Sequence, residues 1–207
     1  IGLAIASLLV RYFMGFALLI YCFINMTFRN YKEKEYYQSM LKIGMPISLA
    51  VLVEFVAFNS IAILMGRVSG LYAAAQNLVC TLTTISFMVP FAISNAIAVK
   101  VGFANGSDNY EDLKKYSLFG TVLSVSFMIC SAIVFTSFAP HLVRIFTSDA
   151  SLVKIAVPIM YILSIFQVFD GLQISLAGVC KGIKQTNVVL FANFIAYWCV
   201  SIPLGCF

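Results

Sequence analysis

Charged residues are scarce in this 207-residue chain. Asp, Glu, Lys and Arg make up 10% of it, against about 25% in a typical soluble domain. Hydrophobic residues make up 62%, so the composition excludes an ordinary soluble domain. The apolar runs are continuous and much longer than the roughly 10-residue alternating segments of membrane β-barrel strands. We therefore expect an all-α polytopic membrane protein.

Residue patterns that support enzyme chemistry are missing as well. The single histidine, His141, has no partner at metal-ligand spacing, and the six cysteines form no CxxC pair. The chain has no Walker A segment, so it contains no ATPase motif of that kind. The net charge of +5 comes from the connecting segments, so it does not indicate a nucleic-acid partner. We expect neither an enzyme nor a cofactor.

Six apolar stretches are long enough to cross a membrane, which takes about 20 residues. They cover residues 2–28, 43–65, 71–99, 116–140, 153–180 and 187–207. Two polar segments between them, 29–42 and 102–115, are predicted to be loops. The second contains the turn signal Asn105-Gly106.

The basic residues in the connections predict the orientation. Nine of the 13 lie on one side: Arg29, Lys32, Lys34, Lys42, Lys100, Lys114, Lys115, Lys181 and Lys184. Only Arg67, Arg144 and Lys154 lie on the other. The first side is therefore predicted to be cytoplasmic. Residues 1–28 have no basic stretch ahead of the apolar run, which argues against a signal peptide.

Two acids are exceptional because they lie in the middle of membrane-length apolar stretches. They are Glu54 and Asp170, and the other six acids lie in polar connections. A carboxylate at the bilayer centre costs about 2.5–3.5 kcal/mol on insertion scales, so such an acid usually has a function. These two residues are predicted to bind the coupling cation, which would be a proton or Na⁺.

Polar and aromatic residues accompany both acids within one or two helical turns. We predict a substrate cavity lined by Phe58, Asn59, Phe166, Gln167 and Gln173. Carboxylates supply charge and aromatic rings supply cation–π contacts, so this combination suits an organic cation. The simpler interpretation is that each acid only completes a hydrogen bond inside the bundle.

Helix-breaking residues suggest where the spans bend. Pro46 lies near the start of the second span and Pro90 lies deep in the third, and both are predicted hinges or static bends. Gly178 and Gly182 form a GxxxG pattern. It lies at the end of a span and is frequent by chance, so it is only a weak signal for helix packing.

Five segments in order resemble four helices of the multidrug and toxic compound extrusion (MATE) family. KIGMPISLAVLVE (42–54) is similar to its seventh helix, and AAAQ (73–76) with FMVPFAISNAIAVKVG (87–102) to its eighth. FQVFDGLQISLAGVCKGIKQT (166–186) is similar to the tenth, and AYW (196–198) to the eleventh. The resemblance covers essentially the whole chain.

The resemblance implies a twelve-helix transporter of two six-helix bundles, of which this chain would carry part. Residues 1–28 would be the last helix of the amino-terminal bundle, 29–42 the cytoplasmic loop between bundles, and 43–207 five helices of the carboxy-terminal bundle. The first five helices and the twelfth would be absent. Cation-coupling roles would pass to Glu54 and Asp170, which are also the candidate Na⁺ ligands.

The function implied is a secondary antiporter of a bacterial cytoplasmic membrane. It would export drugs and dyes that are organic cations in exchange for Na⁺ or H⁺, as a monomer. A lipid-linked oligosaccharide flippase of the same superfamily and a non-transporting membrane scaffold are the alternatives. Two family positions differ: Phe166 replaces a frequent Tyr four residues before the Asp, and Ala75 replaces a frequent His.

Overall fold

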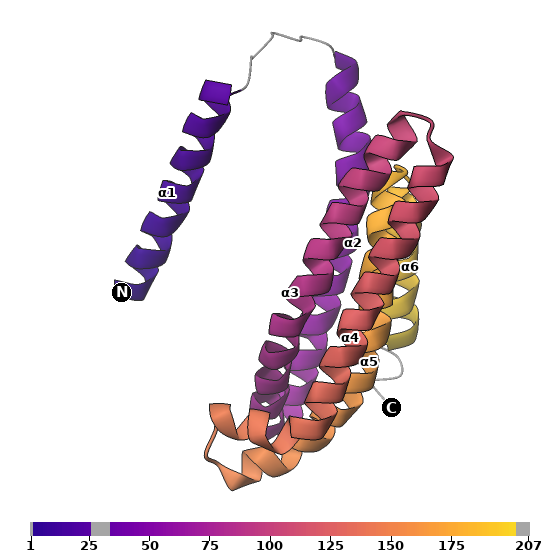
Figure 1. Ribbon diagram of the computed structural model, residues 1–207. Helices are drawn as coiled ribbons and strands as arrows, with labels where there is room; N and C mark the ends of the chain where they lie inside the picture. The colour runs from indigo at the N-terminus through magenta and orange to yellow at the C-terminus, as the bar shows by residue number, and fades with distance from the viewer. Residues whose placement is uncertain (1, 26–33, 202–207) are drawn as a thin grey trace. The chain divides into compact units, whose positions relative to one another are not determined.

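The structure is a computed structural model that describes residues 2–25 and 34–201 (Figure 1). These residues form six α-helices and one π-helix, with no β-strand among them. The elements are α1 (Gly2–Asn25), α2 (Lys34–Val68), α3 (Gly70–Gly106), α4 (Tyr110–Phe146), α5 (Ala150–Gly182), α6 (Thr186–Phe194) and the π-helix η1 (Ile195–Ser201). The predicted all-α class is confirmed.

The chain divides into two compact units, residues 1–39 and 40–207. The first unit contains α1, a 24-residue apolar helix whose described side chains are nearly all exposed. The second contains most of α2 and all later elements. Five helices are long and apolar enough to cross a membrane, and α6 with the first part of η1 forms a shorter apolar helix, Thr186–Val200. The chain is a multi-pass membrane protein.

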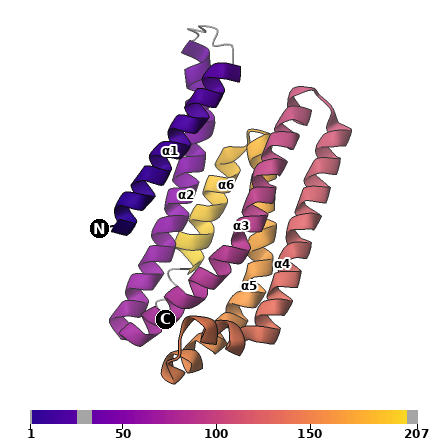
Figure 2. The ribbon, with the colours of Figure 1, turned by 60° about the vertical axis from the view of Figure 1, so that its left-hand side comes forward.

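The helices of the second unit run alternately up and down (Figure 2). The α3–α4 and α5–α6 turns lie at one end, and the α2–α3 and α4–α5 turns lie at the other. Helices α3, α4 and α5 pack against one another. Near the second end they share an apolar core of Ala75, Val79, Leu82, Phe135, Ala139, Val143, Ala156 and Met160.

The helices extend further than the hydropathy pattern predicts. Residues 34–42, expected to be part of a loop, are the first turns of α2. The predicted loop 102–115 is helical except for residues 107–109, and Asn105 and Gly106 belong to α3. The chain turns at Asp108, where φ is +54°. Lys and Glu favour helices. These polar segments are therefore mostly helical, although their polarity predicted loops.

Three turns follow α3, and each leads into a new helix. Two of these helices, α4 and α5, begin with a side-chain cap. Asn109 accepts a hydrogen bond from the Asp112 backbone N–H at 3.2 Å. Asp149 accepts one from Ser151 N–H at 2.9 Å. Such caps satisfy N–H groups that have no partner inside the helix. They allow the long helices to reverse within a few residues.

Small residues bring α5 close to its neighbours. A Cβ atom on Gly182 would lie 2.8 Å from Val101 Cβ, and one on Gly102 would lie 3.6 Å from the Gly182 carbonyl oxygen. Gly178 is equally close to α3. This GxxxG pattern, a weak signal in the sequence, therefore has a packing role, since both glycines permit close approach of α3 and α5.

Candidate cation-coupling site

Glu54 lies on α2 and points toward the last helix of the described chain. Asn193 Nδ2 donates a hydrogen bond to Glu54 Oε2 at 3.3 Å. Tyr197 Oη donates one to Glu54 Oε1 at 3.4 Å. Each carboxylate oxygen therefore has one neutral donor from the α6–η1 segment. Glu54 itself is half-buried.

The two donors lie on one face of the last helix. Asn193 and Tyr197 are four residues apart, on successive turns, and only 6% and 8% exposed. The change from α-helix to π-helix occurs between them, at Ile195. Isolated π-helical turns are frequent at functional sites. The buried polar face of α6–η1 is therefore directed at an acid of α2.

Gln173 of α5 completes the hydrogen-bond chain. Its Nε2 donates to Asn193 Oδ1 at 3.1 Å, and its side chain also interacts with Tyr197. Three elements, α2, α5 and α6–η1, thus contribute to one polar cluster. We call Glu54, Gln173, Asn193 and Tyr197 the Glu54 cluster.

Asp170 adds a second carboxylate beside this cluster. It lies one turn before Gln173 on α5, is half-buried, and interacts electrostatically with Glu54 and Tyr197. No hydrogen bond to its carboxylate is present within residues 2–25 and 34–201. The structure thus brings together the two acids that were singled out from the sequence. They differ in one respect: Glu54 has donors and Asp170 has none in the described part of the chain.

The oxygen-rich composition of the site fits alkali cations and protons. Carboxylate oxygens are hard ligands of the kind that hard cations prefer. Within the described residues, no three His, Cys, Asp or Glu side chains converge as a transition-metal site would require. Glu54 and Asp170 are the residues that could hold a Na⁺ ion, with Gln173, Asn193 and Tyr197 as neutral neighbours.

Gln167 was predicted to share this cavity, but its side chain makes other contacts. It is 3% exposed, and its Nε2 lies 2.8 Å from both Ser86 Oγ on α3 and Ser131 Oγ on α4. Residues three apart on a helix differ in direction by about 60°, so Gln167 and Gln173 lie about 120° apart. The polar residues near Asp170 on α5 therefore belong to two separate clusters.

The remaining predicted cavity residues differ in position. The Phe58 ring lies 5.7 Å from the Tyr197 ring, centroid to centroid, so it borders the Glu54 cluster. Asn59 donates its side-chain N–H to the Phe55 carbonyl of its own helix at 2.7 Å, and the structure gives it no contact with the cluster. Phe166 lies one turn before Asp170 and is 42% exposed.

The two predicted hinge prolines lie inside helices. Pro46 is in α2 and Pro90 is in α3. Pro90 is fully buried and cannot donate to the Ser86 carbonyl one turn earlier. Ser86 is the α3 partner of Gln167. The α3 proline therefore lies next to the cluster that joins α3, α4 and α5.

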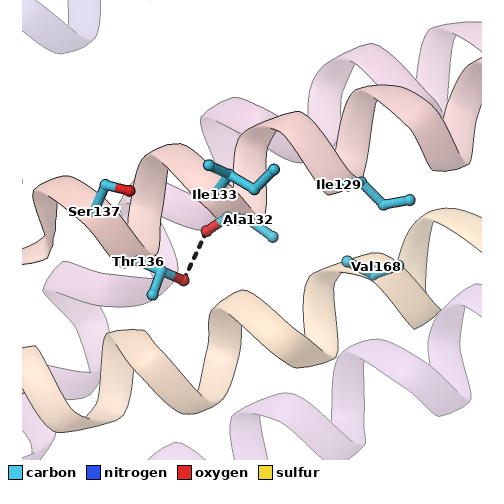
Figure 3. Close-up of a pocket in the computed structure, with 6 residues that line it drawn as sticks. All are labelled: Ile129, Ala132, Ile133, Thr136, Ser137 and Val168. Atoms are coloured by element: carbon cyan, nitrogen blue, oxygen red, sulfur yellow. Dashed lines mark hydrogen bonds between the residues drawn. The ribbon is translucent and has the colours of Figure 1, made fainter.

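A groove between α4 and α5 is a poor candidate for a cation site (Figure 3). Its volume is about 290 Å³, and it is lined by Ile129, Ala132, Ile133, Thr136, Ser137 and Val168. The Thr136 hydroxyl donates to the Ala132 carbonyl at 2.8 Å. None of the lining residues carries charge, so the groove is suited to apolar contact.

Sequence reasoning missed Asn193, Tyr197, Ser86 and Ser131. A signal for the first two was present in FANFIAYW (191–198), where an amide and a phenol stand four residues apart in an apolar run. Such spacing puts both on one helix face. The serines carried no comparable signal, because hydroxyls in membrane helices commonly bond their own backbone.

Comparisons with known proteins cover most of the chain. Residues 46–207 match the family model MatE. The chain is 31% identical over 218 residues to "Probable multidrug resistance protein NorM" of Photorhabdus laumondii subsp. laumondii, covering 99% of this chain and 47% of that protein. It is 30% identical over 217 residues to "Probable multidrug resistance protein NorM" of Mesorhizobium japonicum, with 99% and 46% covered.

A third relative is "Multidrug resistance protein NorM" of Aliivibrio fischeri, 25% identical over 214 residues, with 99% of this chain and 46% of that protein covered. The chain spans about half the length of the curated relatives it matches.

Proposed function

The chain belongs to the MatE family, and from that premise we propose that it acts in a secondary active multidrug efflux antiporter. The proposed transporter exports organic cations in exchange for Na⁺ or H⁺. Residues 1–28 would contribute the last helix of one bundle and residues 43–207 most of the other. Alternating access in such folds requires two bundles that move around a site near the bilayer midplane.

One observation supports the proposal: two acids of apolar helices, Glu54 on α2 and Asp170 on α5, interact electrostatically, and Gln173, one turn from Asp170, belongs to the Glu54 cluster. Two like charges in a poorly hydrated region repel each other, and the repulsion is relieved when a cation or proton enters. The same charge attracts a cationic drug. Coupling ion and substrate can therefore compete for one pair of acids, which is the simplest basis for antiport.

The aromatic groups beside the acids suit organic cations. Phe58 and Tyr197 are in ring contact, and Phe166 stands one turn from Asp170. Ring faces attract cations over distances up to about 6 Å. Flat, hydrophobic, positively charged drugs and dyes are thus the proposed substrates. The proposed location is the cytoplasmic membrane of a bacterium, with the α3–α4 and α5–α6 turns on the cytoplasmic side and the transporter a monomer.

Dye efflux tests this proposal. Cells expressing the whole protein that carries this sequence are loaded with a cationic dye, and Na⁺ and proton gradients are imposed separately. We expect at least one gradient to drive efflux. Efflux that is the same with and without either gradient, and the same in cells lacking the protein, would indicate a membrane scaffold instead.

A further inference from the structure

We infer that Asn193 and Tyr197 hold the Glu54 carboxylate when its coupling ion has left, and thereby promote ion release. This inference rests on the proposed function, because it assigns a role to neighbours of the proposed coupling acid. The two are positioning residues: each acts through Glu54. The first supporting observation is the one-to-one pairing, Asn193 to Oε2 and Tyr197 to Oε1.

The orientation of the Asn193 amide is fixed by a third residue. Its Oδ1 accepts from Gln173 Nε2 at 3.1 Å, so its N–H₂ end faces Glu54. An inverted amide would oppose oxygen to oxygen at the carboxylate. Asn193 is therefore held as a donor. Because it is buried, water cannot readily replace it.

Tyr197 is held in a similar way. Its ring packs against Phe58, and its hydroxyl is the only hydrogen-bonding group that the side chain has. The Tyr197 side chain also interacts with Gln173. Gln173 of α5 therefore contacts both donors, which ties their position to the helix that carries Asp170.

The charged and titratable groups that interact with Glu54 define what the donors do. The titratable ones among the described residues are Asp170 and Lys181 of α5 and Tyr197 of η1. Asp170 repels negative charge on Glu54, and Lys181 attracts it. The neutral donors are thus the direct partners of the carboxylate oxygens in this arrangement, and they favour its charged form.

An arriving ion competes with these donors for the same lone pairs. Hydrogen bonds to the charged carboxylate are stronger than those to a carboxyl group neutralised by a proton or a Na⁺ ion. Each hydrogen bond to the empty carboxylate therefore weakens ion binding. Without them, the ion would leave more slowly and the transport cycle would stall in the loaded state.

Tyr197→Phe tests the inference because it removes one hydroxyl and keeps the ring that packs on Phe58. Dye efflux is measured against the concentration of whichever coupling ion drives the wild type. We expect the half-saturating ion concentration to fall about three- to tenfold, as expected for loss of one hydrogen bond, with a lower maximal rate. Asn193→Leu should shift it in the same direction.

Tyr161→Phe is the matched control. Tyr161 is an exposed tyrosine of α5, and this variant should keep the wild-type half-saturating concentration. Tyr197→Phe protein must reach the membrane at wild-type level. If it does and its half-saturating concentration is unchanged, the two residues serve only packing and the inference is wrong. A rise would make the hydroxyl an ion ligand and also overturn it.

The two proposals fail separately. Wild-type cells without gradient-driven efflux overturn the proposed function and this inference with it. Wild-type efflux with unshifted variants overturns this inference alone.

Discussion

Gly178 of α5 lies so close to Ser94 of α3 that a Cβ atom on Gly178 would be 2.5 Å from the Ser94 carbonyl oxygen. The Ser94 hydroxyl in turn donates to the Ile174 carbonyl of α5 at 2.7 Å. The two helices thus meet backbone to backbone, with a hydroxyl bridging them. Close approach of this kind is what drives helix association in membranes, where the hydrophobic effect between helices is absent.

Gly178→Ala should destabilise the bundle by about 1–3 kcal/mol, because the new methyl group meets backbone that cannot move aside without separating the helices. Thermal unfolding of the purified protein in detergent measures this. Gly44→Ala is the control, since a Cβ there would meet nothing within 4 Å. Equal unfolding temperatures for the two variants would show that the α3–α5 contact tolerates expansion.

Two substitutions of Gln167 should have different effects. The Gln167 Oε1 atom is buried without a hydrogen-bond partner in the described part of the chain. Leu at this position removes that unsatisfied group and fills similar space, so stability should change by less than about 1 kcal/mol. Ala leaves a cavity and should cost about 2–4 kcal/mol.

The same unfolding assay measures both Gln167 variants. The serine partners can still bond each other when Gln167 is replaced, because Ser86 and Ser131 are in direct hydrogen-bond contact. A Leu variant as unstable as the Ala variant would mean that the amide contacts to the two serines outweigh the unsatisfied oxygen.

Glu54→Gln and Asp170→Asn should each abolish gradient-driven efflux and leave membrane insertion intact. Both changes keep side-chain shape and remove a proton or cation site. The measurement is dye efflux from cells in which the variant reaches the membrane at wild-type level. Ser60→Ala, on the same helix as Glu54, is the control, since its hydroxyl bonds only the Val56 carbonyl. Normal efflux by either acid variant would favour a non-transporting role.

Residues 1–207 alone should insert into liposomes but not transport. The chain spans about half the length of its curated relatives, and rocking-bundle transport requires two bundles. Dye movement under an imposed cation gradient is compared with that of the whole protein. Comparable rates from residues 1–207 would contradict the two-bundle mechanism.

The sequence predicted the helical class and singled out the two acids inside apolar spans for the same physical reason. Charge is costly in hydrocarbon, so its absence marks the spans and its presence marks Glu54 and Asp170. Helix ends were predicted less well. An apolar run ends where charged residues begin, whereas the backbone hydrogen bonds of the helix continue beyond that point. The first turns of α2 and the last turns of α3 show this.

The partners of Glu54 could not be predicted in this way. Whether Asn193 faces Glu54 depends on the lateral position and rotation of α6 relative to α2, and no periodicity within either helix encodes that relation. The direction of Gln167 was misjudged for a related reason. In the sequence, Gln167 and Gln173 are close enough to be assigned to one helix face. In the bundle, the angle of about 120° between them directs them at different neighbouring helices.

The short turn at residues 107–109 joins two helices of 37 residues each. At about 1.5 Å per residue such a helix is about 55 Å long, whereas a bilayer with its headgroups is about 40–45 Å thick. A typical tilt of about 20° shortens the projection only slightly. The apolar part of α3 begins at its first turn, so the excess length falls at the Asp108 end. We therefore expect the tip of the α3–α4 hairpin to project beyond the lipid headgroups into water. An epitope inserted beside Asp108 would show from which side of the membrane an antibody reaches it.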